Sequence, residues 1–513
     1  FHVGSSSFLY RSCLLARACR AMATAGEAVH PQLLHHLKLR CVGPPEIIRA
    51  PLSHQREDDR RLGQLVHQID MLRPLLKAGW LCAAVRSLVV LSLGIGLLCI
   101  GGTRWMFMES ASAWMAIVFV AGCVLTSLGL VGVPGGVPFL DVTTSAGFHC
   151  LETHCGTTRN SRIRKSFEAW LLGVRQCPYL KSGELCTVLP FFWNPNRMRG
   201  MKYERIWVQA SDGERFASDW VFPSSGHDPD QPIVLLLTGL APSQHWTTTG
   251  GFVADVAYHL SHRRGMTVVV LVARGTMDTY VNTHLFHGAQ VTDLRELVML
   301  IDGVLGTSHG PGFSRPPLFA AGFSMGGIIL ANYCGIYGPD ARICGAVQFS
   351  GVYDSAYNMK FEYSMKTWQA YLAYGIKLNF FEKRFVPEAR RRGVNTERVL
   401  SREVASIVDF DIEFTAVYNG YKSVLDYYRD QSLGHGEKWK HVAVPLLAVA
   451  ARDDPITHCD ALKVEFAAAN ENLLFLITER GGHVGWPLGW RPWRRGFDFM
   501  SEAVEVFIRS VLP

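Results

Sequence analysis

From about residue 200 onward, short continuous apolar runs alternate with stretches of helical periodicity. Continuous apolar runs are typical of parallel strands that are covered on both faces, whereas half-exposed strands alternate between apolar and polar residues. The pattern therefore predicts an α/β fold with a mostly parallel central sheet and helices on both faces. We expect strands at 233–237, 267–272, 318–321, 346–350, 446–449 and 473–477, with helical stretches at 292–305 and 328–333.

Two departures from this alternation add to the predicted architecture. The runs 206–209 and 215–222 flank Asp212-Gly213, which predicts an antiparallel hairpin at the start of the domain. Between residues 351 and 442 the alternation stops, and a helical segment rich in aromatic residues follows. This insertion suits a cap over the edge of the sheet; alternatively, its aromatic side chains pack only its own core. We assign the α/β domain to 201–513 and the cap to 351–442.

Two uncharged apolar runs precede the domain, at 87–103 and 113–133. A helix that spans a bilayer needs about 20 apolar residues, within a range of roughly 17 to 25. We therefore expect two transmembrane helices; a buried helical hairpin is the alternative, but neither run has a polar face. Basic residues flank the pair on its outer sides, while the connecting loop has only Arg104. We therefore expect a multi-pass membrane protein with two spans, and by the positive-inside tendency we expect the α/β domain to be cytosolic.

The remaining segments have weaker patterns. Residues 1–26 contain arginine and serine but no acidic residue, which fits either a transit peptide or untranslated sequence read through to Met22. Residues 27–86 are polar and predict a cytosolic tail, and residues 134–200 are expected to be a connecting region.

Composition supports membrane contact and narrows the partners. The charged fraction is 19% and the mean hydropathy is +0.11, which is apolar for a soluble protein. The net charge of +7 is spread along the chain without the sustained basic stripe of a nucleic-acid binder, so we expect no nucleic-acid partner. The 13 cysteines include no Cys-x-x-Cys pair. His149-Cys150 and His154-Cys155 lack a second ligand pair at usable spacing, so we expect no metal site.

The first candidate for chemistry is Ser324, within Gly322-Phe323-Ser324-Met325-Gly326. This pentapeptide lies between a predicted strand and a predicted helix, a context in which a sharp turn exposes the serine hydroxyl at the edge of the sheet. Its glycines are required because the backbone crosses itself closely at such a turn. A serine hydroxyl is a poor nucleophile at neutral pH, so it needs a base, an orienting acid and donors for an oxyanion.

A base and an acid are expected at the ends of two later strands, at the rim where ligands bind in open α/β sheets. His483 follows the strand at 473–477 and lies among glycines, which give its loop freedom to bring the imidazole over Ser324. Asp454 follows the strand at 446–449 and is our choice for the acid because it directly precedes a proline. Asp453 is the near alternative, and Asp354 is a more distant one.

Two backbone N–H groups are expected to hold the oxyanion. One belongs to Met325, directly after the nucleophile, and the other to the loop Thr238-Gly239-Leu240, where Leu240 is our choice. Backbone donors leave no side-chain signature, so this prediction depends on position alone.

Taken together, these motifs resemble the AB hydrolase 4 family of α/β-hydrolases, and the resemblance covers roughly Pro178 to the C-terminus. The family includes membrane-anchored acylglycerol lipases, phospholipases and medium-chain esterases, and the embryogenesis-associated proteins of plants. The motifs that carry the resemblance are Asp212-Gly213, Asp219-Trp220, Arg274-Gly275, Thr292-Asp293-Leu294-Arg295, Gly322-Phe323-Ser324-Met325-Gly326-Gly327, Asn332-Tyr333, Phe410-Asp411, Gly420-Tyr421, Asp426-Tyr427-Tyr428-Arg429, Asp453-Asp454-Pro455-Ile456 and Gly481-Gly482-His483.

The resemblance implies an α/β-hydrolase fold with Ser324, Asp454 and His483 as the catalytic triad. It also implies chemistry without a metal or an organic cofactor. One position departs from the family pattern: the oxyanion loop usually has His-Gly, whereas this chain has Thr238-Gly239. The backbone donor survives this change, but the packing of the loop, and with it the rate and the substrate preference, is open.

The prediction is a membrane-anchored serine hydrolase that cleaves carboxylic esters of lipids, with the bilayer and a lipid ester as its partners. Two alternatives remain: an acyltransferase that uses the same acyl-enzyme, and a non-catalytic lipid-binding module. Trp486, Trp490 and Trp493 lie among Arg491, Arg494 and Arg495 and fit contact with lipid headgroups; the alternative is simple packing of a tryptophan-rich surface loop. The sequence does not indicate an oligomeric state.

Overall fold

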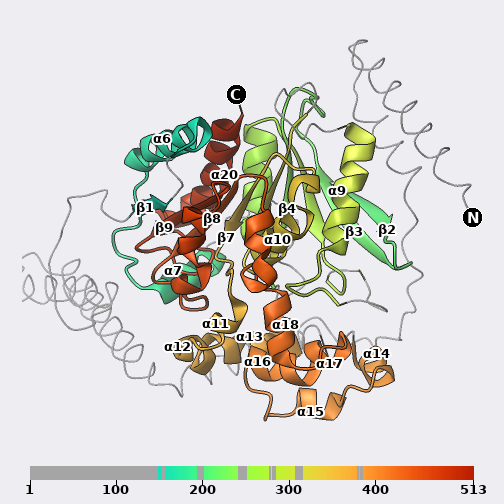
Figure 1. The fold of residues 1–513 in the computed structure, drawn as a ribbon. Coiled ribbons are helices and arrows are strands. Elements are labelled where there is room, and N and C mark those ends of the chain that lie inside the picture. Colours follow the sequence, from blue (N-terminus) through green and yellow to red (C-terminus); the bar gives the residue numbers. More distant parts are fainter. Residues whose placement is uncertain are drawn as a thin grey trace, which may run out of the picture.

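A central sheet organises the computed structural model, which describes residues 148–152, 156–192, 201–240, 251–276, 279, 285–306, 316–377, 381 and 385–512. In these residues the sheet has nine strands, in the order β1-β9-β8-β7-β6-β4-β5-β3-β2 (Figure 1). The strands are β1 Phe148–Glu152, β2 Glu204–Gln209, β3 Arg215–Val221, β4 Ile233–Leu237, β5 Thr267–Val272, β6 Leu318–Phe323, β7 Gly345–Phe349, β8 Leu446–Ala451 and β9 Leu473–Thr478.

The sheet is mostly parallel, which confirms the α/β fold expected from the apolar pattern. The six neighbouring strands β9, β8, β7, β6, β4 and β5 pair in parallel. β2 and β3 form the predicted antiparallel hairpin at one edge. β3 pairs antiparallel with β5, and β1 pairs antiparallel with β9 at the other edge. Because both faces of the inner strands are covered, every residue of β4 to β9 is buried.

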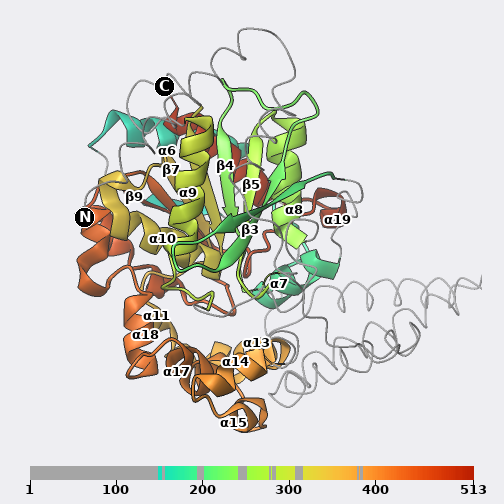
Figure 2. The ribbon, with the colours of Figure 1, turned by 90° about the vertical axis from the view of Figure 1, so that its right-hand side faces the viewer.

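Two layers of helices cover the two faces (Figures 1 and 2). On one face, Ile233 and Leu235 of β4 pack with the apolar sides of α9 and α10. On the other, the alternate residues Val234 and Leu236 pack with α6, α8 and α20. This alternation is the period of two that a strand dictates. The helices are α6 Thr158–Gly173, α8 Gly251–Tyr258, α9 Thr292–Leu305, α10 Met325–Tyr337 and α20 Asp498–Val511.

The insertion after β7 is helical, as its sequence indicates, and lies beyond the edge of the sheet at which β7 ends (Figure 1). Phe381, Phe410 and Phe414 form its own aromatic core, against which Leu240 of the loop after β4 also packs. The aromatic residues therefore build the insertion and join it to the sheet. Its helices are α11 Ser355–Asn358, α12 Glu362–Lys366, α13 Trp368–Ile376, α14 Val386–Arg391, α15 Thr396–Leu400, α16 Ile407–Phe410, α17 Ala416–Tyr418 and α18 Val424–Asp430.

The segment at 134–200, expected to be a connecting region, contributes structure to the domain. It supplies β1 at the edge of the sheet, α6 against α20, and α7 (Gly183–Phe192) near the ends of β8 and β9. The sequence pattern did not indicate these elements, because β1 lacks a long apolar pattern and α7 contains Pro190.

The expected transit or untranslated segment (1–26), the cytosolic tail (27–86) and the two membrane spans (87–103 and 113–133) lie outside the described residues. Within the described ranges, no helix has both the length and the apolar character that crossing a membrane requires.

Candidate active site

Ser324 occupies the turn that the pentapeptide predicts, between the end of β6 and the start of α10. Its backbone has φ 52° and ψ −119°, a conformation that non-glycine residues rarely adopt. The amide of Ser324 donates to the carbonyl of Phe349 on the neighbouring strand at 2.8 Å, which fixes the turn to the sheet. The side chain is thus held at the carboxyl edge of the parallel strands.

The loop after β4 touches this turn. A Cβ added to Gly326 would lie 2.4 Å from the carbonyl oxygen of Thr238, so only glycine allows the two backbones to meet. A Cβ added to Gly239 would lie 3.0 Å from the Cβ of Ser324. These contacts bring the backbone that leads to Leu240 next to the serine.

Met325 is the first residue of α10, and Leu240 directly follows Gly239. N–H groups in the first turn of a helix have no partner within the helix, and the helix dipole favours negative charge there. Met325 follows the serine, and Leu240 follows the glycine that approaches the serine side chain, so both positions are compatible with oxyanion donors. Thr238, at the position where the family pattern has histidine, is buried.

His483 lies between the serine and a carboxylate. Its Nε2 is 2.9 Å from Ser324 Oγ, and its Nδ1 is 2.9 Å from Asp454 Oδ2. A carboxylate only accepts hydrogen bonds, so Nδ1 carries the proton and Nε2 is left to accept from the hydroxyl. The imidazole is buried, with 7% of the residue exposed. The structure brings together the three side chains predicted from the sequence.

Asp454 is oriented by the loop in which it lies. Its Oδ1 accepts from the amides of Ile456 and Thr457 at 2.8 and 2.9 Å, and its Oδ2 accepts from the Thr457 hydroxyl at 2.8 Å. The other two acids considered point elsewhere. Asp453 accepts from two amides of the histidine loop, and Asp354 caps α11 by accepting from the Tyr357 amide. The geometry therefore favours Asp454 among the three.

Asp453 differs from Asp454 in its electrostatics. Burial raises the pKa of the Asp453 carboxyl to about 6, although the amides of Gly481 and Gly482 favour its charged form. Its Oδ2 has no hydrogen-bond partner among the described residues. A buried carboxylate without a cation beside it is costly to ionise, so Asp453 is poorly suited to hold a charged imidazolium.

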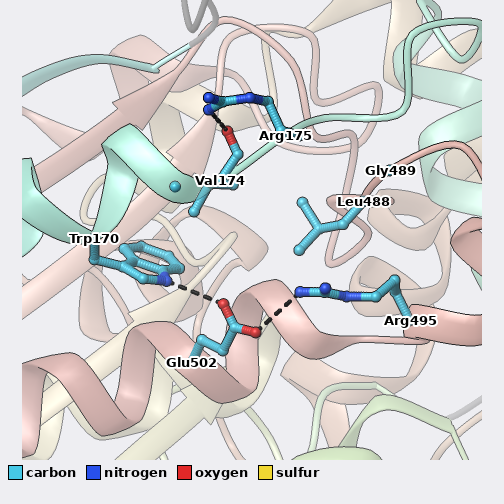
Figure 3. A pocket seen from close by; sticks show the side chains of 8 residues that line it. Trp170, Val174, Arg175, Leu488, Gly489, Arg495 and Glu502 are labelled. Atoms are coloured by element: carbon cyan, nitrogen blue, oxygen red, sulfur yellow. Dashed lines mark hydrogen bonds and ion pairs between the residues drawn. The ribbon is translucent and has the colours of Figure 1, made fainter.

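Two other features of the structure are separate from this site. His458, Cys459 and Asp460 are the one group in the described residues whose side chains could share a metal ion, and Asp460 is exposed. A hollow of about 330 Å³ lies beside α6 and α20, where Trp170 Nε1 and the guanidinium of Arg495 both donate to Glu502 (Figure 3). The hollow contains none of the predicted site residues.

Sequence reasoning missed two hydroxyl groups that hold the histidine loop, those of Thr187 and Ser350. Thr187 Oγ1 accepts from the amide of His483 at 2.8 Å, and Ser350 Oγ accepts from the amide of Val484 at 3.1 Å. A single hydroxyl that accepts from a distant amide leaves no pattern in the sequence, so only the fold reveals these contacts.

The chain is similar in sequence to several known proteins. No family model matches the chain. The chain is 26% identical over 322 residues to a protein named phospholipase ABHD3 from Bos taurus, covering 61% of this chain and 72% of that one. It is 26% identical over 332 residues to the embryogenesis-associated protein EMB8 of Picea glauca, covering 61% and 67%. It is 24% identical over 273 residues to a monoacylglycerol lipase of Saccharomyces cerevisiae, covering 52% and 57%.

Proposed function

We propose that this chain, a carboxylic-ester hydrolase that resembles the AB hydrolase 4 family of α/β-hydrolases, cleaves esters of lipids through an acyl-enzyme on Ser324. The observation that carries this proposal is the line of two 2.9 Å contacts from Ser324 Oγ through His483 to Asp454. A lipid substrate is supported by the names of the relatives, which include a phospholipase and a monoacylglycerol lipase.

In the first step, Ser324 Oγ attacks the ester carbonyl while His483 Nε2 takes the hydroxyl proton. The negative charge that develops on the carbonyl oxygen is stabilised by the N–H groups of Met325 and Leu240. Asp454 keeps the imidazole in the required tautomer and stabilises the imidazolium. His483 then returns the proton to the leaving alcohol, which departs and leaves an ester between the acyl group and Ser324.

In the second step, water attacks the acyl-enzyme and His483 takes a proton from that water. The second tetrahedral intermediate collapses, His483 returns the proton to Ser324, and the carboxylic acid leaves. Every proton in this scheme is carried by the chain's own side chains, so the mechanism needs no cofactor.

The test of the nucleophile is Ser324→Ala, examined with a fluorophosphonate probe and with a panel of monoacylglycerol, phospholipid and short-chain esters. We expect loss of both labelling and turnover with an unchanged melting temperature. The matched control is Ser261→Ala, because Ser261 is a fully buried serine whose Oγ contacts a carbonyl far from the site. Labelling or ester turnover that persists in Ser324→Ala would remove the nucleophile assignment.

The same panel distinguishes hydrolysis from acyl transfer. An alcohol can intercept the acyl-enzyme in place of water, so ethanol or glycerol is added and the products are separated. Hydrolysis as the main reaction predicts free fatty acid as the dominant product at moderate alcohol concentrations. Ester as the dominant product would instead identify an acyltransferase, and a wild-type protein that does not react with the probe would favour a non-catalytic lipid-binding module.

We also propose that the protein is attached to a membrane by the expected spans at 87–103 and 113–133 and that its α/β domain contacts the lipid surface. Trp490 is 73% exposed and Trp493 is 44% exposed, so both are available to the headgroup region, where tryptophan is favoured. The expectation was wrong for Trp486, which is fully buried and stacks on Phe499.

The surroundings of Trp490 fit an anionic lipid surface. Leu172, at the end of α6, is 70% exposed, and the neighbouring Arg175 carbonyl accepts from the Gly489 amide, so α6 and the tryptophan loop meet. Figure 3 shows this junction, with Arg175 beside Leu488 and Gly489. Arg175, Arg491 and Arg494 are exposed and have no carboxylate partner in the described part of the chain.

Lipid contact is measurable by fluorescence quenching in vesicles of phosphatidylcholine and phosphatidylserine that contain brominated acyl chains. We expect the full chain to be quenched and Trp490→Phe to lose part of that quenching. Trp439→Phe serves as the control, since Trp439 stacks on Phe466. Equal quenching in wild type and Trp490→Phe would exclude this surface as the lipid contact.

A further inference from the structure

The loop that carries His483 is pressed against the first turns of α7, which comes from the segment before the α/β domain. A Cβ added to Gly485 would lie 2.0 Å from the carbonyl oxygen of Cys186. A Cβ added to Gly482 would lie 2.4 Å from the carbonyl oxygen of Gly183. The two backbones are thus in direct contact, and the loop cannot move toward α7 nor admit a side chain between them.

Side chains fix the loop at four consecutive amides, those of residues 481 to 484. Asp453 Oδ1 accepts from the amides of both Gly481 and Gly482 at 2.9 Å. Thr187 Oγ1 accepts from the amide of His483 itself at 2.8 Å, and the Val484 amide donates to Ser350 at 3.1 Å. Asp453 and Ser350, which accept three of these hydrogen bonds, lie just after the ends of β8 and β7. Thr187 is the one acceptor that belongs to α7.

Thr187 is itself fixed in position. Its hydroxyl donates to the carbonyl of Gly183 at 2.6 Å, so the lone pairs of Oγ1 face the amide of His483. The residue is 4% exposed, so water does not readily replace it as an acceptor. The amide of His483 therefore depends on one buried hydroxyl for its hydrogen bond.

The same part of α7 is joined to the insertion through Glu184. Tyr363 of α12 donates its hydroxyl to Glu184 Oε1 at 2.7 Å, and Ser182 donates to the other oxygen of Glu184. The neighbouring Ser364 donates to the carbonyl of Ile456 at 2.9 Å, and the amide of Ile456 donates to Asp454. Thus α12 contacts both α7, whose Thr187 binds the amide of His483, and the loop that contains Asp454.

We propose that Thr187 is a positioning residue for His483, and that Tyr363 couples the insertion to this position through Glu184. This inference rests on the proposed function, since it assigns a task to residues around the proposed base. Its physical basis is that proton transfer requires the 2.9 Å approach of Nε2 to Ser324 Oγ, and a misplacement of about 1 Å can cost roughly 100-fold in rate.

The test is Thr187→Val, which keeps the shape of the side chain but removes the acceptor. We expect kcat and the rate of fluorophosphonate labelling to fall about 10- to 100-fold while KM changes less than about threefold. Thr187→Ser restores the hydroxyl and is expected to recover most of the rate. The matched control is Thr267→Val: Thr267 is 1% exposed and its hydroxyl contacts the His227 ring, so this variant loses a buried hydrogen bond elsewhere.

Coupling to the insertion is tested with Tyr363→Phe in a double-mutant cycle with Thr187→Val. Tyr363→Phe alone is expected to lower kcat about 3- to 10-fold, and the combined variant to lose less than the product of the two, because both act on one turn of α7. Tyr421→Phe is the control within the insertion, since the Tyr421 hydroxyl also donates to a carboxylate, that of Asp430.

The outcomes separate this inference from the proposed function. A wild-type protein that neither hydrolyses esters nor reacts with the probe would end the proposed function. An active wild type with unchanged kcat in a folded Thr187→Val, or a loss that Thr187→Ser does not restore, would overturn the positioning role. If Thr187→Val does not fold, Thr187→Ala removes the same hydroxyl in its place: wild-type kcat in a folded Thr187→Ala overturns the positioning role, and wild-type kcat in Tyr363→Phe overturns the coupling.

Discussion

Two groups of polar side chains, most of them buried, lie near the carboxyl ends of the parallel strands, and they differ in what they can do. One is Ser324, His483 and Asp454. The other is Arg274, which follows β5 and is 1% exposed, with Asp212, Glu214 and Asp293 around its guanidinium. The first group contains a hydroxyl and an imidazole that can exchange a proton, whereas the second contains an arginine that cannot be deprotonated. Only the first is suited to chemistry.

The Arg274 group instead joins three elements. Its Nη1 contacts Asp212 Oδ2 at 2.6 Å and Glu214 Oε2 at 2.8 Å, both near the turn between β2 and β3, and its Nε donates to Asp293 Oδ2 at 2.8 Å at the start of α9. Three motifs that looked separate in the sequence therefore form one ionic cluster. A motif that resembles one of a hydrolase family can therefore stabilise the fold and need not take part in catalysis.

The largest expected effect of a single change is on catalysis by the first group. His483→Ala removes the proposed base, so we expect kcat to fall about 10⁶-fold, roughly 8 kcal/mol of activation free energy. The free energy of unfolding is expected to change by no more than about 1–2 kcal/mol, because the imidazole contributes two hydrogen bonds. Turnover of a short-chain ester and urea unfolding measure the two quantities.

The control for this variant is His458→Ala, because His458 lies on the loop beyond Asp454 but contacts neither Ser324 nor His483 in the described structure. Retention of more than about one hundredth of the wild-type kcat in His483→Ala would exclude His483 as the general base.

Arg274→Met is expected to have the opposite effect, a large loss of stability with little change in kcat. Removing the guanidinium takes the Arg274 cation away from the buried carboxylates of Glu214 and Asp293, which is expected to cost about 3–5 kcal/mol of unfolding free energy. The kcat of the remaining folded protein is expected to stay within about threefold of wild type. Arg342→Met is the control, since Arg342 pairs with Asp302 and Asp340 in a partly exposed position and is expected to cost less than about 1 kcal/mol.

Urea unfolding followed by a turnover assay below the transition tests this prediction. A large loss of kcat in Arg274→Met without a loss of stability would mean that the ionic cluster takes part in the reaction, and the distinction between the two groups would fail.

The apolar pattern predicted most of the parallel sheet, because strands buried on both faces must be continuously apolar. The run at 233–237 coincides with β4, and the run at 267–272 coincides with β5. The positions of Ser324, Asp454 and His483 could also be predicted from the sequence, since each residue follows a recognisable strand. That these side chains act as predicted remains a proposal, although the fold brings them into contact.

What the sequence did not predict depends on contacts between distant backbones. The helix α7 contains a proline and lies before the expected domain, so its pattern gave no reason to join it to the histidine loop. The role of Thr187 follows only from its distance to the amide of His483, 296 positions away. Such a contact has no local signal, because any buried hydroxyl at the right place would serve.

The smallest expected effect is on the pH dependence of stability and concerns Asp453. This residue directly precedes Asp454 but belongs to neither group. The ordinary pKa of aspartate is about 3.9, and burial raises the pKa of the Asp453 carboxyl to about 6 in the folded protein. Between these values the folded protein binds more protons than the unfolded chain, so the stability that this group contributes is present below about pH 4 and is lost as the pH rises through 6. The loss is up to about 2–3 kcal/mol.

Asp453→Asn removes this titration and keeps an oxygen that can accept from Gly481 and Gly482. We therefore expect the variant to gain stability relative to wild type between pH 4 and pH 6.5, measured by urea unfolding across that range. Asp340→Asn is the control with the opposite sign, because hydrogen bonds from Arg342 lower the pKa of the exposed Asp340 carboxyl. If the stability of wild type and Asp453→Asn changes with pH in the same way, the charged Asp453 carboxylate is stabilised in the folded protein as well as the carboxylates around Arg274. The contrast between a buried acid with a cation and one without would then fail.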